Sequence, residues 1–123
     1  MPATARRLEA QSTAELVSWM RKYLGLTYKQ VGTLAGATTR TAQRWGNADE
    51  LTVPSGDHRV RVEQLRDLKR LLLSTFPDEQ VALQWLHREV ALLGGRRPID
   101  LIKWGDLGPV VEVLAGAHAG AFA

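Results

Sequence analysis

Residues 26–45 of the chain are LTYKQVGTLAGATTRTAQRW, and this stretch predicts two short helices joined by a tight turn. Thr27 can act as an N-cap, and Gln30 three residues later completes a capping box, so the first helix should begin at Tyr28. The Gly-Ala pair after this helix provides the turn. The side chains of the first helix that we expect to be buried are Tyr28, Val31, Leu34 and Ala35.

The second predicted helix of this pair has a polar and basic outer face. Thr38 can cap the helix, while Ala42 and Trp45, three residues apart, should face inward. At about 100° per residue, this inward direction leaves the polar side chains outside. On the outer face and its flanks lie Thr39, Arg40, Thr41, Gln43 and Arg44.

These outward side chains have the chemistry of a DNA-recognition helix. Arginine can bond both O6 and N7 of guanine, glutamine can do the same with adenine, and threonine can bond bases or phosphates. Residues 27–47 contain three cations and no anion. We therefore predict a DNA-binding helix-turn-helix module. Its expected DNA contacts are Lys29, Thr39, Arg40, Thr41, Gln43 and Arg44. The alternative is an ordinary helical hairpin with a solvated polar face.

Composition separates the two halves of the chain by charge. The 123 residues are 45% hydrophobic, enough for a workable core, and their net charge is +3. Residues 1–70 hold twelve Lys and Arg against seven Asp and Glu, while residues 71–123 hold four against six. This distribution predicts that only the first half meets phosphates.

The composition also indicates where in the cell the protein is expected. The chain has no cysteine, which excludes disulfides and thiolate metal sites and fits a reducing compartment. Its N-terminus has no apolar run of signal-peptide length, and no segment approaches the roughly 20 apolar residues of a membrane span. We expect a cytoplasmic protein with no membrane partner.

Helix and loop signals divide the chain into two modules. Residues 1–11 should form a frayed arm, after which Ser12 and Glu15 provide a capping box for a helix that ends at Gly25. Residues 46–58, rich in Gly, Asn, Asp and Pro, predict a loop and a module boundary. The expected modules are residues 1–58 and 59–123.

The second module should contain four helices. Residues 59–76 have apolar side chains at three-to-four spacing, which predicts an amphipathic connecting helix that could also dimerise. Asp78 should cap the next helix, and Pro98 should begin another, whose apolar positions are Ile99, Leu101, Ile102 and Trp104. A last helix is expected at residues 109–117. No segment shows sustained strand alternation, so the predicted fold is all-α.

A spaced pattern of Trp, Gly, Pro and Asp residues runs through the second module. It consists of Trp85-Leu86, Leu93-Gly94-Gly95, Pro98-Ile99-Asp100-Leu101-Ile102, Gly105, Val110, Val113-Leu114 and Gly120. This order and spacing resemble the C-terminal toxin-binding domain of the Xre/MbcA/ParS family of bacterial antitoxins. The preceding helix-turn-helix also fits, so the resemblance spans roughly residues 26–123. The chain departs from it at Glu89-Val90, where the family usually has Pro-Asn.

The resemblance implies an antitoxin of a type II toxin–antitoxin system. Antitoxins of this family bind RES-domain toxins, which degrade NAD+ or transfer ADP-ribose, and block the toxin's active site with their C-terminal segment. Here that segment is residues 115–123, which has no charged side chain and one bulky anchor, Phe122. A frayed terminus is the alternative interpretation of this tail. The predicted toxin contacts are Arg96, Arg97, Lys103, His118, Gly120, Phe122 and Ala123.

No pattern in the sequence predicts catalysis. The three histidines lack the spacing of a helical metal pair, and no Gly-rich phosphate loop follows a strand. We therefore expect no enzyme, no metal and no cofactor. The expected partners are a cognate RES-domain toxin and operator DNA, with a homodimer or a larger toxin–antitoxin assembly, because one small module contacts few base pairs. Two other hypotheses remain, a stand-alone transcription regulator whose second half dimerises or senses a ligand, and an adaptor that has lost DNA binding.

Overall fold

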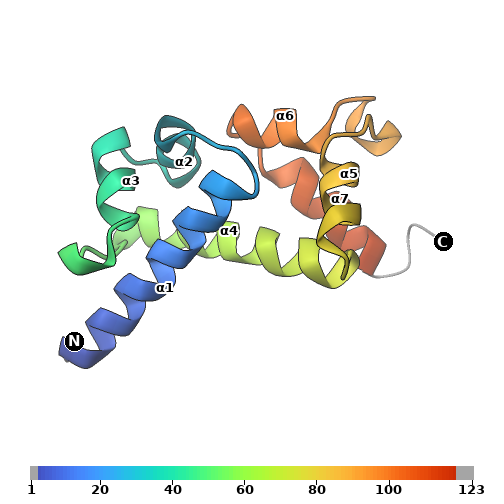
Figure 1. Cartoon of the computed structure of the whole chain (residues 1–123). Helices are drawn as coiled ribbons and strands as arrows, with labels where there is room; N and C mark the ends of the chain where they lie inside the picture. Colours follow the sequence, from blue (N-terminus) through green and yellow to red (C-terminus); the bar gives the residue numbers. More distant parts are fainter. Residues whose placement is uncertain (1–2, 119–123) are drawn as a thin grey trace. The chain divides into compact units, whose positions relative to one another are not determined.

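The computed structural model describes residues 3–118, and these residues form seven α-helices and two short 3₁₀ helices (Figure 1). They are α1 (Ala3–Lys22), α2 (Tyr28–Ala35), α3 (Thr39–Trp45), η1 (Ala48–Glu50), α4 (Gly56–Thr75), α5 (Glu79–Leu86), η2 (Ala91–Leu93), α6 (Pro98–Lys103) and α7 (Gly108–His118). The predicted all-α fold is confirmed. The chain divides into two compact units, Met1–Glu63 and Gln64–Ala123, and the division falls within α4. We call them unit 1 and unit 2.

The first helix begins earlier than the sequence predicted. Residues 3–11, expected as a frayed arm, belong to α1, so Ser12 lies inside a helix and does not cap one (blue in Figure 1). Ala10 is buried, and Glu9 forms an ion pair with Arg59 at 3.7 Å. Because Arg59 lies fifty positions further along the chain, local sequence signals could not reveal the contact that holds this end of the helix.

The α2–α3 hairpin forms as predicted. The Thr27 hydroxyl accepts the backbone N–H of Gln30 at 3.1 Å, and the Gln30 amide oxygen accepts the N–H of Thr27 at 2.9 Å. Gly36 ends α2 with φ of 69°, a left-handed conformation that favours glycine. Thr38 then caps α3 by accepting the N–H of Thr41 at 3.1 Å.

A glycine inside α2 allows the hairpin to close. Gly32 is buried, and a Cβ placed on it would lie 2.8 Å from the carbonyl oxygen of Ala37 and 3.0 Å from that of Thr38. These atoms belong to the backbone of the turn, which cannot move aside as a flexible side chain could. Glycine disfavours helices by about 0.5–1 kcal/mol relative to alanine, so its presence here indicates that close approach outweighs helix propensity.

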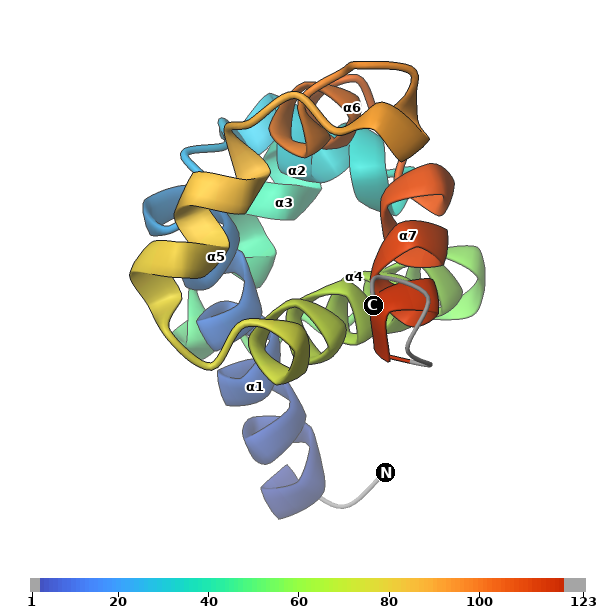
Figure 2. The same cartoon turned by 90° about the vertical axis from the view of Figure 1, so that its right-hand side faces the viewer.

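Unit 2 packs its apolar side chains between the second part of α4 and the helices that follow. Here α6 packs against α5 and α7, and η2 packs against α7 (Figure 2). Asp78 caps α5 by accepting the N–H of Gln80 at 2.8 Å, and Pro98 occupies the first turn of α6, both as predicted. Gly94 and Gly95 adopt φ of 68° and 79° in the turn between α5 and α6. The buried apolar residues of unit 2 are Leu65, Leu68, Leu72, Ala82, Trp85, Leu86, Val90, Leu93, Ile99, Leu101, Ile102, Val110 and Leu114.

The substitution Gly32→Ala should lower the free energy of unfolding by about 2 kcal/mol, because the new methyl group must displace the turn backbone. Urea denaturation of the full chain, followed by far-ultraviolet circular dichroism, measures this change. Gly108→Ala is the matched control, since Gly108 begins α7 and a Cβ there meets nothing within 4 Å. The control should be neutral or stabilising by up to about 1 kcal/mol. Equal losses in both variants would contradict the close-approach argument.

Candidate functional site

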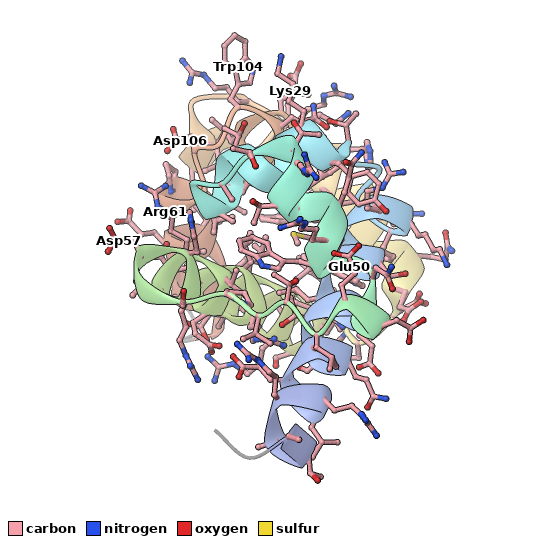
Figure 3. The ribbon with its side chains drawn as sticks, turned by 90° about the vertical axis from the view of Figure 1, so that its left-hand side faces the viewer. Lys29, Glu50, Asp57, Arg61, Trp104 and Asp106 are labelled. Carbon is pink, nitrogen blue, oxygen red and sulfur yellow. The ribbon has the colours of Figure 1, made fainter. Side chains whose placement is uncertain are left out.

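The outer face of α3 displays the side chains that the sequence predicted for DNA contact. Ala42 and Trp45 are at most 2% exposed and fix the inward side of the helix. Of the six predicted residues on α2 and α3, five are exposed and Thr41 is half-buried. The exposed members of the predicted set are Lys29, Thr39, Arg40, Gln43 and Arg44. Figure 3 shows this side of unit 1, with Lys29 projecting from α2.

Two of these side chains have partners within unit 1. Arg44 forms an ion pair with Glu50 of η1, with Nε and Oε2 3.6 Å apart and both side chains about half exposed (51% and 46%). Exposed pairs of this kind contribute at most about 1 kcal/mol, so a phosphate or base could replace Glu50. The hydroxyl of Thr41 accepts a hydrogen bond from the Thr38 hydroxyl at 3.0 Å, which ties Thr41 to the helix cap. Arg40 makes no side-chain hydrogen bond or ion pair within the described residues.

Sequence reasoning missed a basic side chain from α1 beside this face. The guanidinium of Arg21 lies over the Tyr28 ring at 4.1 Å, and its Nη1 donates to the carbonyl oxygen of Leu26 at 3.1 Å. Tyr28, expected to be buried, is half-buried with Arg21 over its ring. Arg21 and Lys22 also line a cleft of about 340 Å³ where α1 meets the start of α2. The sequence signal that could have indicated this cleft is the pair of basic residues, Arg21 and Lys22, at the end of a predicted helix.

In unit 2, one of the predicted toxin contacts, Arg97, is hydrogen-bonded within the first turn of α6. Arg97 donates from Nε to Oδ2 of Asp100 and from Nη2 to Oδ1, both at 2.8 Å. These hydrogen bonds lower the pKa of the Asp100 carboxyl and raise the pKa of the Arg97 guanidinium. The pair spans the first turn of α6, so Arg97 stabilises the start of that helix. Arg96 and Lys103 are exposed and make no ion pair within the described residues.

The structure corrects the position expected for Trp104. The sequence placed it among the apolar positions of the helix that begins at Pro98, but Trp104 is the C-cap of α6 and its side chain is 83% exposed. At about 100° per residue, Trp104 lies nearly opposite Ile102 but only about 60° from Leu101, and both are buried, so helical spacing does not decide its direction. In the structure it projects into solvent (Figure 3). It lines a cleft of about 540 Å³ together with Arg96, Asp100, Leu101 and Asp106.

The remaining predicted toxin contacts fall outside the described part of the chain. Gly120, Phe122 and Ala123 lie beyond it, as does the side chain of His118, whose backbone ends α7. Residues 3–118 contain no group of three or more side chains suited to hold a metal ion. None of their helices combines the length and apolar character needed to cross a membrane.

The two described histidines have structural contacts. Nδ1 of His58 lies 3.2 Å from the carbonyl oxygen of Ala35, and its ring meets the Trp45 ring edge-on at 5.7 Å. Nδ1 of His87 lies 2.9 Å from the carbonyl oxygen of Leu83, one turn earlier in the chain. These contacts explain both side chains without a chemical role.

Comparison with known proteins identifies the family. The family model of the antitoxin Xre/MbcA/ParS C-terminal toxin-binding domain matches residues 71–119. The chain is 29% identical over 109 residues to the mycobacterial cidal antitoxin MbcA of Mycobacterium tuberculosis, covering 89% of this chain and 94% of that protein. It is 31% identical over 93 residues to the "Probable mycobacterial cidal antitoxin Rv3188" of the same species, covering 76% of each.

One solved structure also resembles the chain. A chain in the crystal structure of the M. tuberculosis MbcT–MbcA toxin–antitoxin complex is 28% identical, with a TM-score of 0.49, covering 89% of this chain and 96% of that chain. The matched residues 71–119 contain the spaced pattern that begins at Trp85, apart from Gly120. The protein is therefore a non-enzymatic antitoxin that belongs to the Xre/MbcA/ParS family.

Proposed function

We propose that this antitoxin neutralises a toxin protein through unit 2 and binds operator DNA through unit 1, so that it represses its own operon. The observation that carries the first part is the match of residues 71–119, all within unit 2, to a toxin-binding domain model. The toxin proposed is a RES-domain enzyme that degrades NAD+ or transfers ADP-ribose. The family assignment favours this function over a stand-alone transcription regulator.

The proposed neutralising element is the end of the chain, residues 119–123. These residues are AGAFA, without a charged side chain, so transfer from water into a narrow active site would strip no ionic group of its solvent. Phe122 offers the apolar area that such an insertion would bury. In this proposal α7 delivers the segment, and Arg96 and Lys103 add polar contacts with the toxin.

The proposed DNA interface is centred on α3. Arg40 is exposed and unpaired within the described residues, so its guanidinium is free to make the bidentate bonds that arginine forms with guanine. Gln43 lies three residues further, on the same face, and can pair with adenine. Lys29 and Arg21 would contact phosphates beside the groove, which positions the helix without selecting a sequence. Because α3 has only seven residues, a homodimer or a toxin-linked assembly should supply a second DNA contact.

The direct experiment is co-expression with the product of the neighbouring toxin-sized reading frame. A stable complex that relieves the toxicity supports the proposal, and the mass of the purified complex gives its stoichiometry. Absence of a complex and of any relief of toxicity would contradict neutralisation. A gel shift with the promoter of the operon tests DNA binding separately.

Arg40→Ala should weaken operator binding by about 1–3 kcal/mol if Arg40 contacts a base. Fluorescence anisotropy with operator DNA at a fixed salt concentration measures this loss. Arg88→Ala removes an exposed arginine of unit 2 and serves as the matched control with unchanged affinity. If Arg40→Ala binds as tightly as the control, α3 is not the recognition helix.

Glu50→Gln should raise DNA affinity by up to about fivefold, because it releases Arg44 from an ion pair worth at most about 1 kcal/mol. Asp49→Asn is the matched control, since it removes the neighbouring charge without freeing Arg44. Salt titrations should show a steeper salt dependence, by about one unit of slope, only for Glu50→Gln. Equal gains in the two variants would mean that general charge, and not release of Arg44, improves binding.

Deletion of residues 119–123 should raise the antitoxin concentration needed for half-inhibition of the toxin by about tenfold or more. Operator affinity and the free energy of unfolding should stay unchanged, because unit 1 carries the DNA contacts. A chain in which these five positions are Gly and Ser controls for length. Full inhibition by the truncated chain would show that the tail does not block the active site.

A further inference from the structure

The turn after α6 fixes the backbone that carries Trp104 at the surface. Gly105, with φ of 85°, follows the helix in the left-handed conformation, and its N–H donates to the carbonyl oxygen of Ile102 at 3.0 Å. The N–H of Asp106 donates to the carbonyl oxygen of Leu101 at 2.9 Å. These two bonds form a Schellman motif, which ends a helix rigidly. The backbone that carries the indole is therefore ordered before any partner binds.

No other part of the described chain covers this indole. Trp104 is 83% exposed, more than any other large hydrophobic side chain among the described residues. It makes no ring or cation contact there, whereas Trp19, Trp45 and Trp85 all stack or pack with another ring. Tryptophan offers a large contact area with only two rotatable side-chain bonds, so little conformational entropy is lost when a partner covers it.

The charges around Trp104 define what the cleft can accept. Asp100 is neutralised by its two hydrogen bonds to Arg97. Arg96 and Asp106 have no ion pair within the described residues, so one cation and one anion remain available beside the indole. With Leu101 they surround a cleft of about 540 Å³, large enough for one or two side chains of a partner.

This chemistry fits a protein loop and not a nucleic acid. An unpaired Asp106 beside the indole would repel phosphates, and residues 71–123 carry six acidic side chains against four basic ones. A protein loop can instead place an apolar side chain on the indole, a carboxylate on Arg96 and a donor on Asp106. Tryptophan and arginine are the residues on which interface energy most often concentrates.

We propose that the Trp104 cleft is a toxin-docking site separate from the C-terminal tail, and that it receives a toxin loop with an apolar and an acidic side chain. This inference rests on the proposed function, and it assigns the partner because the cleft lies within residues 71–119, which match the toxin-binding domain. The cleft supplies affinity through a preformed surface, while the tail supplies inhibition. A second copy of the chain is the rival occupant.

The test measures toxin binding by calorimetry with the full-length variant Trp104→Ala. The expected result is about thirtyfold weaker binding, with partial recovery in Trp104→Phe and about fivefold weaker binding in Arg96→Ala. Leu92→Ala is the matched control, because Leu92 is 68% exposed but does not line the cleft. Since the Trp104 side chain is almost fully exposed, its removal should leave the free energy of unfolding unchanged.

Each outcome has a distinct meaning. If the unsubstituted chain does not bind the toxin, the proposed function itself fails. If it binds and Trp104→Ala binds equally well, only the docking site is wrong.

Light scattering of the free protein tests the rival occupant. A dimer that dissociates in Trp104→Ala, with toxin affinity unchanged, would assign the cleft to a second copy of the chain. The loss of affinity should also persist when residues 119–123 are absent, and its disappearance there would show that the cleft acts only through the tail.

Discussion

A helix of seven residues is too short to be stable alone in water, so α3 depends on the burial of its inner face. Ala42 and Trp45 provide that burial, and the Trp45 ring also meets His58 at the start of α4. Once these two residues point inward, helical geometry leaves Arg40 no direction except outward. The candidate DNA surface therefore follows from packing, and any change that loosens Trp45 would disturb recognition without touching a contact residue.

In unit 2 as well, one set of residues forms the core and another set lies exposed at the surface. Ile99, Leu101 and Ile102, members of the pattern typical of the family, are at most 5% exposed and form the core, while Gly94 and Gly95 shape a turn. A pattern of this kind specifies the fold shared by antitoxins of the family, but it leaves little surface for a partner. The side chains that can distinguish one partner from another lie between the pattern residues, as Arg96 and Trp104 do.

Local signals predicted the helix ends well, since their causes lie within a few residues. The cap at Thr27, the turn at Gly36 and the start of α6 at Pro98 all depend on neighbouring backbone atoms. What the sequence did not predict falls into two groups: contacts between residues distant in the sequence, and the buried face of a helix too short to show a clear apolar pattern. Arg59 of α4 pairs with Glu9 of α1, and Glu50 pairs with Arg44 across a loop.

Trp104 illustrates the second kind of failure. A helix of six residues contains fewer than two turns, so its apolar spacing does not define a face, and an apolar residue at its end can point either way. The sequence predicted that Arg40, Gln43 and Arg44 are exposed on α3, as they are, but it could not show that Thr41 and Arg97 already have partners. Side-chain partners are set by three-dimensional positions that periodicity does not encode.

The uneven charge of the chain implies that its two proposed functions depend on different physical forces. Twelve of its sixteen basic side chains fall in residues 1–70, so phosphate binding there rests on charge and weakens as salt screens it. The proposed contacts of Trp104 and of the apolar tail instead rely mainly on removing nonpolar surface from water, which salt does not screen, although the contact proposed for Arg96 is ionic. If both proposed functions hold, rising salt should weaken binding to DNA more than binding to the toxin. The proposed neutralisation would then be the less salt-sensitive of the two functions, because it depends less on long-range electrostatics than the proposed operator binding does.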